Sequence, residues 1–189
     1  MVYMIIIFGV SDLGYHNAYS SIEKIKEFAN NKDYLTISSS DKPNYNYSID
    51  DIDLISDNIA NDIYIKYSTL HNVQYKYSLE DKVYYRWMRG IEDKDKETDN
   101  QYYAKNIVIM YVNNYTLSDG ETKGRQELEN TGTGEGLFIT NGKYINITWK
   151  KASSTSKTLW LDQNGEEIVL NDGITYVQIV PLNYKVEIN

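Results

Sequence analysis

The stretch Ile107-Val-Ile-Met-Tyr-Val112 decides the fold class, because six consecutive positions carry apolar or aromatic side chains. Successive side chains of a strand point to opposite faces, so a run without a polar position indicates a strand covered on both faces. We therefore expect 107–112 to be a central strand of a sheet that is packed on both sides. Lys105 and Asn106 precede this strand and could line a cleft at its mouth.

Two Asn-Gly pairs, Asn141-Gly142 and Asn164-Gly165, each separate two runs of strand-forming residues. Asn-Gly suits the positive backbone φ angles of a tight hairpin turn, so both pairs predict hairpin tips. After the first turn, Trp149 belongs to the same alternating set as Ile145 and Ile147, and we expect this tryptophan to lie in the core.

Alternating apolar residues extend the strand pattern upstream, beginning at Ile63. Arg86 and Trp87 are neighbours in one of these strands and must point to opposite faces. The pattern predicts an α+β protein. Residues 63–189 form a β-rich domain with an antiparallel or mixed sheet, and residues 1–62 form a small, incomplete α/β segment.

The first 62 residues carry helical signals. Ser20 and Glu23 have the spacing of a capping box, and Asn30-Asn31 should end the helix that follows. Isoleucines spaced three and four apart in 52–59 predict a second short helix.

Composition excludes several classes of function. The 189-residue chain has a net charge of −8, which argues against binding to nucleic acid or anionic lipid. Cysteine is absent, which excludes disulfides, zinc–thiolate sites, iron–sulfur clusters and thiol catalysis. Met4–Phe8 lacks the basic flank and cleavage site of a secretory signal and is far too short to span a bilayer. The 19 tyrosines suit either strand packing or a surface that binds sugars or peptides.

Other motifs favour structural roles. Gly132–Gly136 resembles a phosphate-binding loop, but a strand rather than a helix should follow it, so we expect a bulged turn. Asp93–Asp99 has alternating acids like a calcium loop but lacks its glycine and its final glutamate, which favours a charged turn over a cation site. With His16 and His71 as the only histidines, a multi-histidine metal site is excluded. We expect neither a metal nor a cofactor.

Several blocks of sequence occur in an order typical of a known family. They are YHNAYSSIEKI (15–25), YYRWMRG (84–90), AKNIVIMYV (104–112), GTGEGLFITNG (132–142), GKYINITWKK (142–151), DQNGEEI (162–168) and LNDGITYVQIVP (170–181). Together they resemble the YerB-like family of predicted lipoproteins of Gram-positive bacteria, whose carboxy-terminal domain has no known function. The resemblance covers residues 8–182 and makes 1–62 the tail of the family's amino-terminal domain.

The resemblance implies an extracytoplasmic protein of the cell envelope. It implies membrane attachment only through a lipid anchor that is absent from this chain, because the signal peptide and lipidated cysteine have no counterpart here. The chain therefore resembles a carboxy-terminal portion or a shortened member. Tyr15 replaces the family's proline and Asp93 a usual histidine, which weakens any two-histidine site.

The sequence places its candidate ligand site where the loop before the first helix meets the β-rich domain. His16, Asn17 and Tyr19 would contribute from the loop, and Arg86 would contribute a bidentate contact to a carboxylate or phosphate. This predicts a His16–Arg86 side-chain distance of roughly 10 Å or less, within one ordinary pocket. In the alternative, His16 and Asn17 tie down the loop and Arg86 pairs with an acid.

Two hypotheses of function follow. The first is a cell-envelope module that binds wall glycan, a peptide or another envelope protein. The second is a hydrolase or lyase acting on wall polymers, with His16 or a carboxylate pair as general base. No catalytic residue is assigned.

Overall fold

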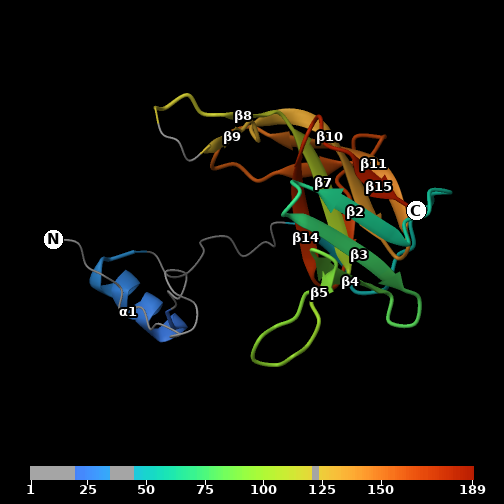
Figure 1. The fold of residues 1–189 in the computed structure, drawn as a ribbon, viewed down its shortest axis with the longest axis horizontal. Helices are drawn as coiled ribbons and strands as arrows, with labels where there is room; N and C mark the ends of the chain where they lie inside the picture. Colours follow the sequence, from blue (N-terminus) through green and yellow to red (C-terminus); the bar gives the residue numbers. More distant parts are fainter. Residues whose placement is uncertain (1–19, 35–44, 121–123) are drawn as a thin grey trace. The chain divides into compact units, whose positions relative to one another are not determined.

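The computed structural model describes residues 20–34, 45–120 and 124–189. The chain divides into two compact units, residues 1–43 and residues 44–189, which we describe separately. The second unit holds every strand of the described residues (Figure 1). The prediction of a β-rich fold with antiparallel and mixed sheets is confirmed.

A five-stranded mixed sheet contains the strand on which the prediction rested. Its strands lie in the order β12 (Leu159–Leu161), β11 (Lys143–Lys151), β10 (Gly132–Thr140), β7 (Asn106–Val112) and β14 (Thr175–Pro181). All neighbours are antiparallel except β7 and β14, which are parallel.

A six-stranded antiparallel sheet covers one face of the five-stranded sheet. Its strands are β15 (Val186–Ile188), β2 (Asp62–Lys66), β3 (Asn72–Ser78), β4 (Val83–Met88) and β5 (Ile91–Glu92), in that order, with β6 (Tyr103–Ala104) also paired to β4. Two smaller pairs complete the unit, parallel β1 (Asn46–Ser48) with β13 (Val169–Asn171), and antiparallel β8 (Asn114–Thr116) with β9 (Gln126–Leu128).

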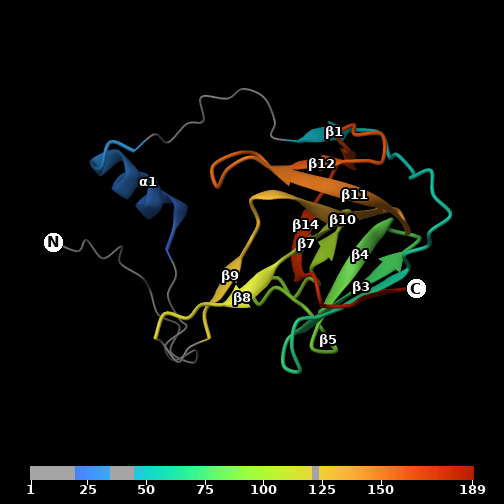
Figure 2. The same cartoon turned by 90° about the horizontal axis from the view of Figure 1, so that it is seen from above.

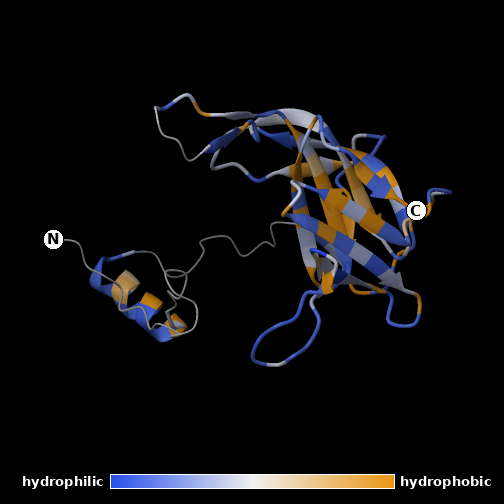
Figure 3. Ribbon diagram, in the orientation of Figure 1, coloured by the Kyte–Doolittle hydropathy of each residue, from blue (hydrophilic) through white to orange (hydrophobic). Residues whose placement is uncertain are grey.

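The main core lies between the two large sheets. Ile63, Tyr75 and Tyr84 from the six-stranded sheet and Ile107 and Ile139 from the five-stranded sheet belong to this cluster and are fully buried. Figure 3 shows hydrophilic and hydrophobic residues alternating along β2 and β3, as expected for strands with one face in a core and one in solvent.

A second core covers the opposite face of the five-stranded sheet. Val108, Phe138, Trp149, Trp160 and Leu170 belong to this cluster. Figure 2 shows β1 and the strands β3 and β4 on opposite sides of the five-stranded sheet. The doubly covered strand is therefore confirmed, because alternate residues of β7 enter different cores. The expectation that Trp149 is a core residue is confirmed too, since it is 2% exposed.

Both predicted hairpin turns are present. Asn141 and Gly142 have φ angles of 48° and 76° and join β10 to β11. Gly165 has a φ of 82°, and its N–H donates to the carbonyl of Asp162 in the turn after β12.

The glycine-rich segment 132–136 differs from the bulged turn that the sequence predicted. It is the first part of β10 and pairs in register with β11. A Cβ on Gly134 would lie 2.6 Å from the Trp149 ring, and a Cβ on Gly136 would lie 2.3 Å from the Ile109 carbonyl oxygen. These glycines therefore serve close packing within a strand.

The segment between the two predicted domains belongs to the β-rich unit. The sequence placed the boundary after residue 62, whereas the compact unit begins at residue 44. The predicted helix over 52–59 is wrong, because this segment is irregular. The Asn171 side chain holds it by accepting from the Ile52 N–H at 2.7 Å and donating to the Ile52 carbonyl at 2.9 Å.

The first unit contributes helix α1 (Ile22–Asn31) to the described residues. It ends where Asn30-Asn31 predicted, but its N-cap is Ser21 rather than Ser20, since the Ser21 hydroxyl accepts from the Lys24 N–H at 3.3 Å. Within the described residues, no helix is long and apolar enough to cross a membrane.

Candidate functional site

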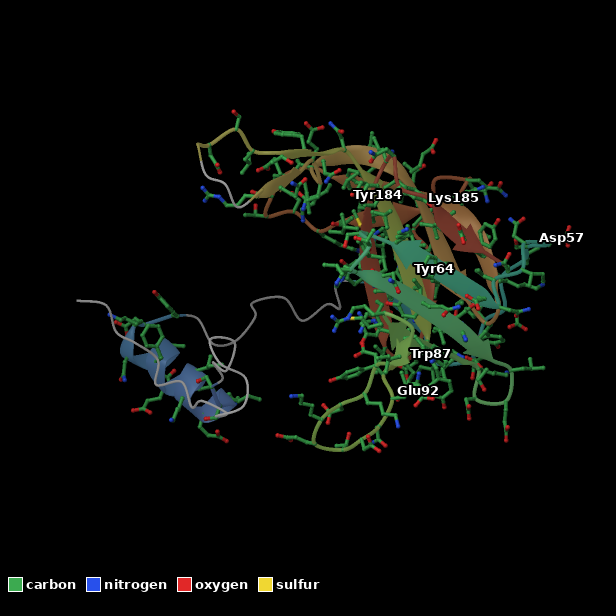
Figure 4. All side chains as sticks on the ribbon, in the orientation of Figure 1. Asp57, Tyr64, Trp87, Glu92, Tyr184 and Lys185 are labelled. Carbon is green, nitrogen blue, oxygen red and sulfur yellow. The ribbon has the colours of Figure 1, made fainter. Side chains whose placement is uncertain are left out.

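The outer face of the six-stranded sheet carries two rows of side chains that run across the strands. The cross-strand register builds the first row from Glu187, Tyr64, Gln74, Trp87 and Glu92. Figure 4 shows Tyr64, Trp87 and Glu92 on the same side of this sheet. Tyr64 and Trp87 lie two strands apart, which sets their backbones about 10 Å apart.

The second row lies two residues further along the strands. It consists of Asp62, Lys76, Tyr85 and Tyr103. Tyr85 and Tyr103 meet edge to face with ring centroids 6.5 Å apart, and Tyr103 is 43% exposed. In both rows the outward side chains are aromatic or polar, and none is aliphatic.

Neighbouring polar groups orient these side chains. The Lys76 ammonium lies 4.8 Å from the centroid of the Trp87 ring, a cation–π contact that restricts the indole. The Gln74 amide donates to both carboxylate oxygens of Asp62 at 2.8 Å. The Tyr85 hydroxyl donates to Asp81 at 3.1 Å, and this hydrogen bond raises the pKa of Tyr85. Tyr85 therefore stays a neutral phenol at physiological pH.

A cavity of about 420 Å³ adjoins the second row. It is lined by Tyr85, Glu92, Lys94, Asp99, Asn100, Gln101 and Tyr103. The cavity therefore combines two aromatic rings with amide, carboxylate and ammonium groups. Such a lining can hold a small polar ligand that also has an apolar face.

Arg86 lies on the inner face of β4, opposite Trp87 as predicted. It forms an ion pair with Asp93, and its guanidinium lies 5.5 Å from the centroid of the Tyr176 ring. Its side chain is 14% exposed. This matches the alternative considered from the sequence, in which Arg86 pairs with an acid. His16, Asn17 and Tyr19 lie outside the described residues, so the His16–Arg86 distance and the four-residue site stay predictions.

The sequence suggested that Lys105 and Asn106 line a cleft, and the structure shows that they do not. Asn106 is fully buried and donates to the Asn171 carbonyl at 2.8 Å. Lys105 is 7% exposed and contacts Asp51 at 2.7 Å. Both side chains therefore fasten neighbouring segments to the sheet.

The acidic segment 93–99 is a charged turn, as predicted. Asp95 accepts hydrogen bonds from the backbone N–H groups of Glu97 and Thr98, and the Thr98 bond is the main reason that the pKa of Asp95 is lowered. Among the residues that the structure describes, no group of three or more acidic or histidine side chains could hold a metal ion.

Most of the β-rich unit, including β3 and β4 of both rows, matches a known family. Residues 63–177 match the model of the carboxy-terminal domain of a protein family of unknown function, DUF3048. The chain belongs to the DUF3048 family. This agrees with the YerB-like resemblance found in the sequence.

A solved structure shares the fold of this DUF3048 chain. The crystal structure of the YerB protein from Bacillus subtilis superposes with a TM-score of 0.76 at 21% identity. The match covers 96% of this chain and 59% of the YerB chain, so this chain spans little more than half of that protein. No curated protein matches the sequence.

The sequence did not single out the aromatic rows, although it contained a signal for them. In β4 the outward set is apolar or aromatic throughout, whereas the inward set contains the charged Arg86. Periodicity alone therefore does not identify the set that faces the core. The structure buries Tyr84 and turns Tyr85 and Trp87 outward. The polar residues Gln74 and Lys76 of the neighbouring strand mark the outward set.

Proposed function

We propose that this DUF3048 domain is an extracytoplasmic module of the cell envelope that binds the glycan of the wall. The single observation that carries the proposal is the pair of aromatic and polar rows on the outer face of the six-stranded sheet. The resemblance to lipoproteins supports the location.

Sugar rings have apolar C–H faces and polar hydroxyl edges. Tyrosine and tryptophan rings match the apolar faces, while amide and carboxylate groups beside them match the hydroxyls. Tyr64 and Trp87 stand about 10 Å apart, or two strand spacings. Each spacing is close to the length of one ring in a β-linked chain, so the first row suits alternate sugars of an extended strand.

The charges on this face favour a neutral glycan over a polyanion. The two rows contain the acids Glu187, Glu92 and Asp62 and the base Lys76. A polyanion such as nucleic acid needs a basic surface. The acids and the lysine within the rows also distinguish this face from the centre of a protein interface, which is depleted of such charged residues.

The test is calorimetric titration of the full chain with a soluble β-1,4-linked N-acetylglucosamine oligosaccharide, together with sedimentation with purified wall sacculi. Trp87→Ala and Tyr64→Ala should each weaken oligosaccharide binding by roughly tenfold, because a stacked ring contributes about 1–3 kcal/mol in comparable aromatic platforms. Tyr115→Ala is the matched control, since Tyr115 is 48% exposed but lies on β8, away from both rows.

Binding that is equal in Trp87→Ala, Tyr64→Ala and the parent chain would remove the aromatic face as the site. Absence of binding to both the oligosaccharide and the sacculi would overturn the glycan proposal. Circular dichroism of each variant checks that the sheet is intact, because outward side chains of a strand contribute little to either core.

A further inference from the structure

The sandwich is open along the side where β15 faces the uncovered part of β10 and β11. Three adjoining cavities of about 360, 550 and 530 Å³ lie on this side, and Asn146 of β11 lines all three. Leu137 of β10 lines the first two. Because they share these lining residues, the three cavities are neighbours, and we call the region that they occupy the β15 groove.

The edge of β15 offers backbone hydrogen-bonding groups to this groove. Asn189 and Asp62 exchange two backbone hydrogen bonds of 2.9 Å, so they are a hydrogen-bonded pair of the antiparallel ladder. Because hydrogen-bonded and non-hydrogen-bonded pairs alternate, the backbone N–H and C=O groups of Glu187 also point toward β2. Those of Val186 and Ile188 point away from β2. Residues 185–189 line the 550 Å³ cavity, so this edge borders the groove.

The floor of the β15 groove is partly apolar. Leu137, Tyr144 and Asn146 line the cavity next to β15. A strand added to an edge points alternate side chains to one face of the sheet. A segment added to β15 would therefore place every second side chain over Leu137 and Tyr144, which is how strand addition acquires specificity.

The remainder of the groove is acidic. Glu135 and Asp162 line the 360 Å³ cavity, and Asp53 and Asp162 line the 530 Å³ cavity, with no lysine or arginine in either lining. Asp162 accepts hydrogen bonds from the Asn164 and Glu166 N–H groups, and the Glu166 bond is the main cause of its lowered pKa. The charges therefore favour a segment that carries lysine or arginine.

We infer that the β15 groove binds an extended, basic polypeptide segment, which adds to β15 as a further strand of the six-stranded sheet. This site differs from the proposed glycan site, and Glu187 is the one residue named here that borders both. It uses the edge of the sheet and the face of β10 and β11, whereas the aromatic rows lie on the outer face of the six-stranded sheet. Its partner is a protein with an exposed lysine-rich extended segment.

The first experiment titrates the full chain with a short, capped peptide of alternating valine and lysine, followed by NMR. We expect the Val186 and Ile188 amides to shift and to gain protection from hydrogen exchange. Two control peptides separate the contribution of the backbone hydrogen bonds from that of the charge. N-methylation of alternate residues removes the ladder hydrogen bonds, and glutamate in place of lysine reverses the charge. Each change should weaken binding by roughly tenfold or more.

The second experiment uses variants of the chain. Val186→Pro removes an outward N–H without breaking a bond to β2, and Val186→Ala matches its loss of packing while keeping the N–H. Val186→Pro should bind the peptide roughly fivefold more weakly than Val186→Ala. Glu135→Lys should weaken the lysine peptide and strengthen the glutamate peptide, each by roughly threefold.

Equal binding of the N-methylated and unmodified peptides would overturn strand addition. Shifts confined to residues other than 185–189 and the groove lining would overturn the site. Loss of glycan binding in Trp87→Ala with peptide binding unchanged is the result expected if the two sites are independent. Loss of both in that variant would overturn their separation.

Discussion

Tyr84 of the six-stranded sheet holds Gly142 of the five-stranded sheet by a hydrogen bond across the core. The Gly142 N–H donates to the Tyr84 hydroxyl at 2.8 Å, and both residues are buried. Burial raises the pKa of Tyr84 well above its usual value, so its hydroxyl stays neutral. The tight turn between β10 and β11 is thereby fixed to the opposite sheet.

Tyr84→Phe should lower the free energy of unfolding by about 1–3 kcal/mol, because it leaves the buried Gly142 N–H without its acceptor. Chemical denaturation monitored by circular dichroism measures this difference. Tyr115→Phe, which removes a hydroxyl from an exposed ring, should change stability by less than about 0.5 kcal/mol. Equal stability of Tyr84→Phe and the parent chain would contradict the role of this bond.

Gly136→Ala should destabilise the fold by about 1–3 kcal/mol, the usual cost of overpacking. Its new Cβ would lie 2.3 Å from the Ile109 carbonyl oxygen, a backbone atom that can move only with the whole sheet. Glu135→Ala is the control, since it alters an outward side chain of the same strand. Thermal unfolding compares the two, and a Gly136→Ala midpoint equal to that of Glu135→Ala would show that β10 and β7 do not need this close approach.

Local signals predicted the parts of the fold that depend on local chemistry. The unbroken apolar run of β7 predicted burial on both faces, because no polar side chain had to be exposed on either. Asn141-Gly142 predicted its turn because the backbone needs positive φ at both positions. In each case the deciding property belongs to a few adjacent residues.

The features that the sequence did not predict depend on contacts between residues that are far apart in the sequence. Ile52, Ile55 and Ile59 have helical spacing, but Ile55 is fully exposed, and the segment is held by Asn171 instead of by its own hydrogen bonds. The aromatic face was missed for a similar reason. Tyr84 and Tyr85 are equally suited to a core, and only the position of the other sheet decides which of them enters it.

Trp87 should account for most of the solvent-accessible tryptophan fluorescence. Of the three tryptophans, Trp149 and Trp160 are 2% and 4% exposed, whereas Trp87 is half-buried on the outer face. Acrylamide should quench one accessible fraction in the parent chain, and Trp87→Phe should remove it. Quenching that persists in Trp87→Phe would mean that one of the two core tryptophans is accessible in solution. Oligosaccharide bound to the aromatic rows should protect this fraction.

Asp51 should make the fold sensitive to acid through Lys105. The Lys105 ammonium contacts Asp51 at 2.7 Å, and the Lys82 ammonium contacts the other carboxylate oxygen at 3.3 Å. The hydrogen bond from Lys105 is the main reason that the pKa of Asp51 is lowered. The folded state therefore favours the carboxylate, which adds stability above the ordinary aspartate pKa of about 3.9 and loses it as pH falls through the lower folded value.

Asp51→Asn should therefore destabilise the fold by about 1 kcal/mol at neutral pH, a moderate value because Asp51 is partly exposed and Lys105 keeps Asn141 as an acceptor at 2.9 Å. The difference from the parent chain should shrink as pH falls below about 4, where the parent carboxylate also becomes protonated. Urea unfolding across this pH range measures the difference. Asp50→Asn is the control, since Asp50 is exposed beside it, and should show no such trend. A difference that stays constant with pH would mean that the carboxylate charge of Asp51 contributes nothing to holding the irregular segment against the sheet.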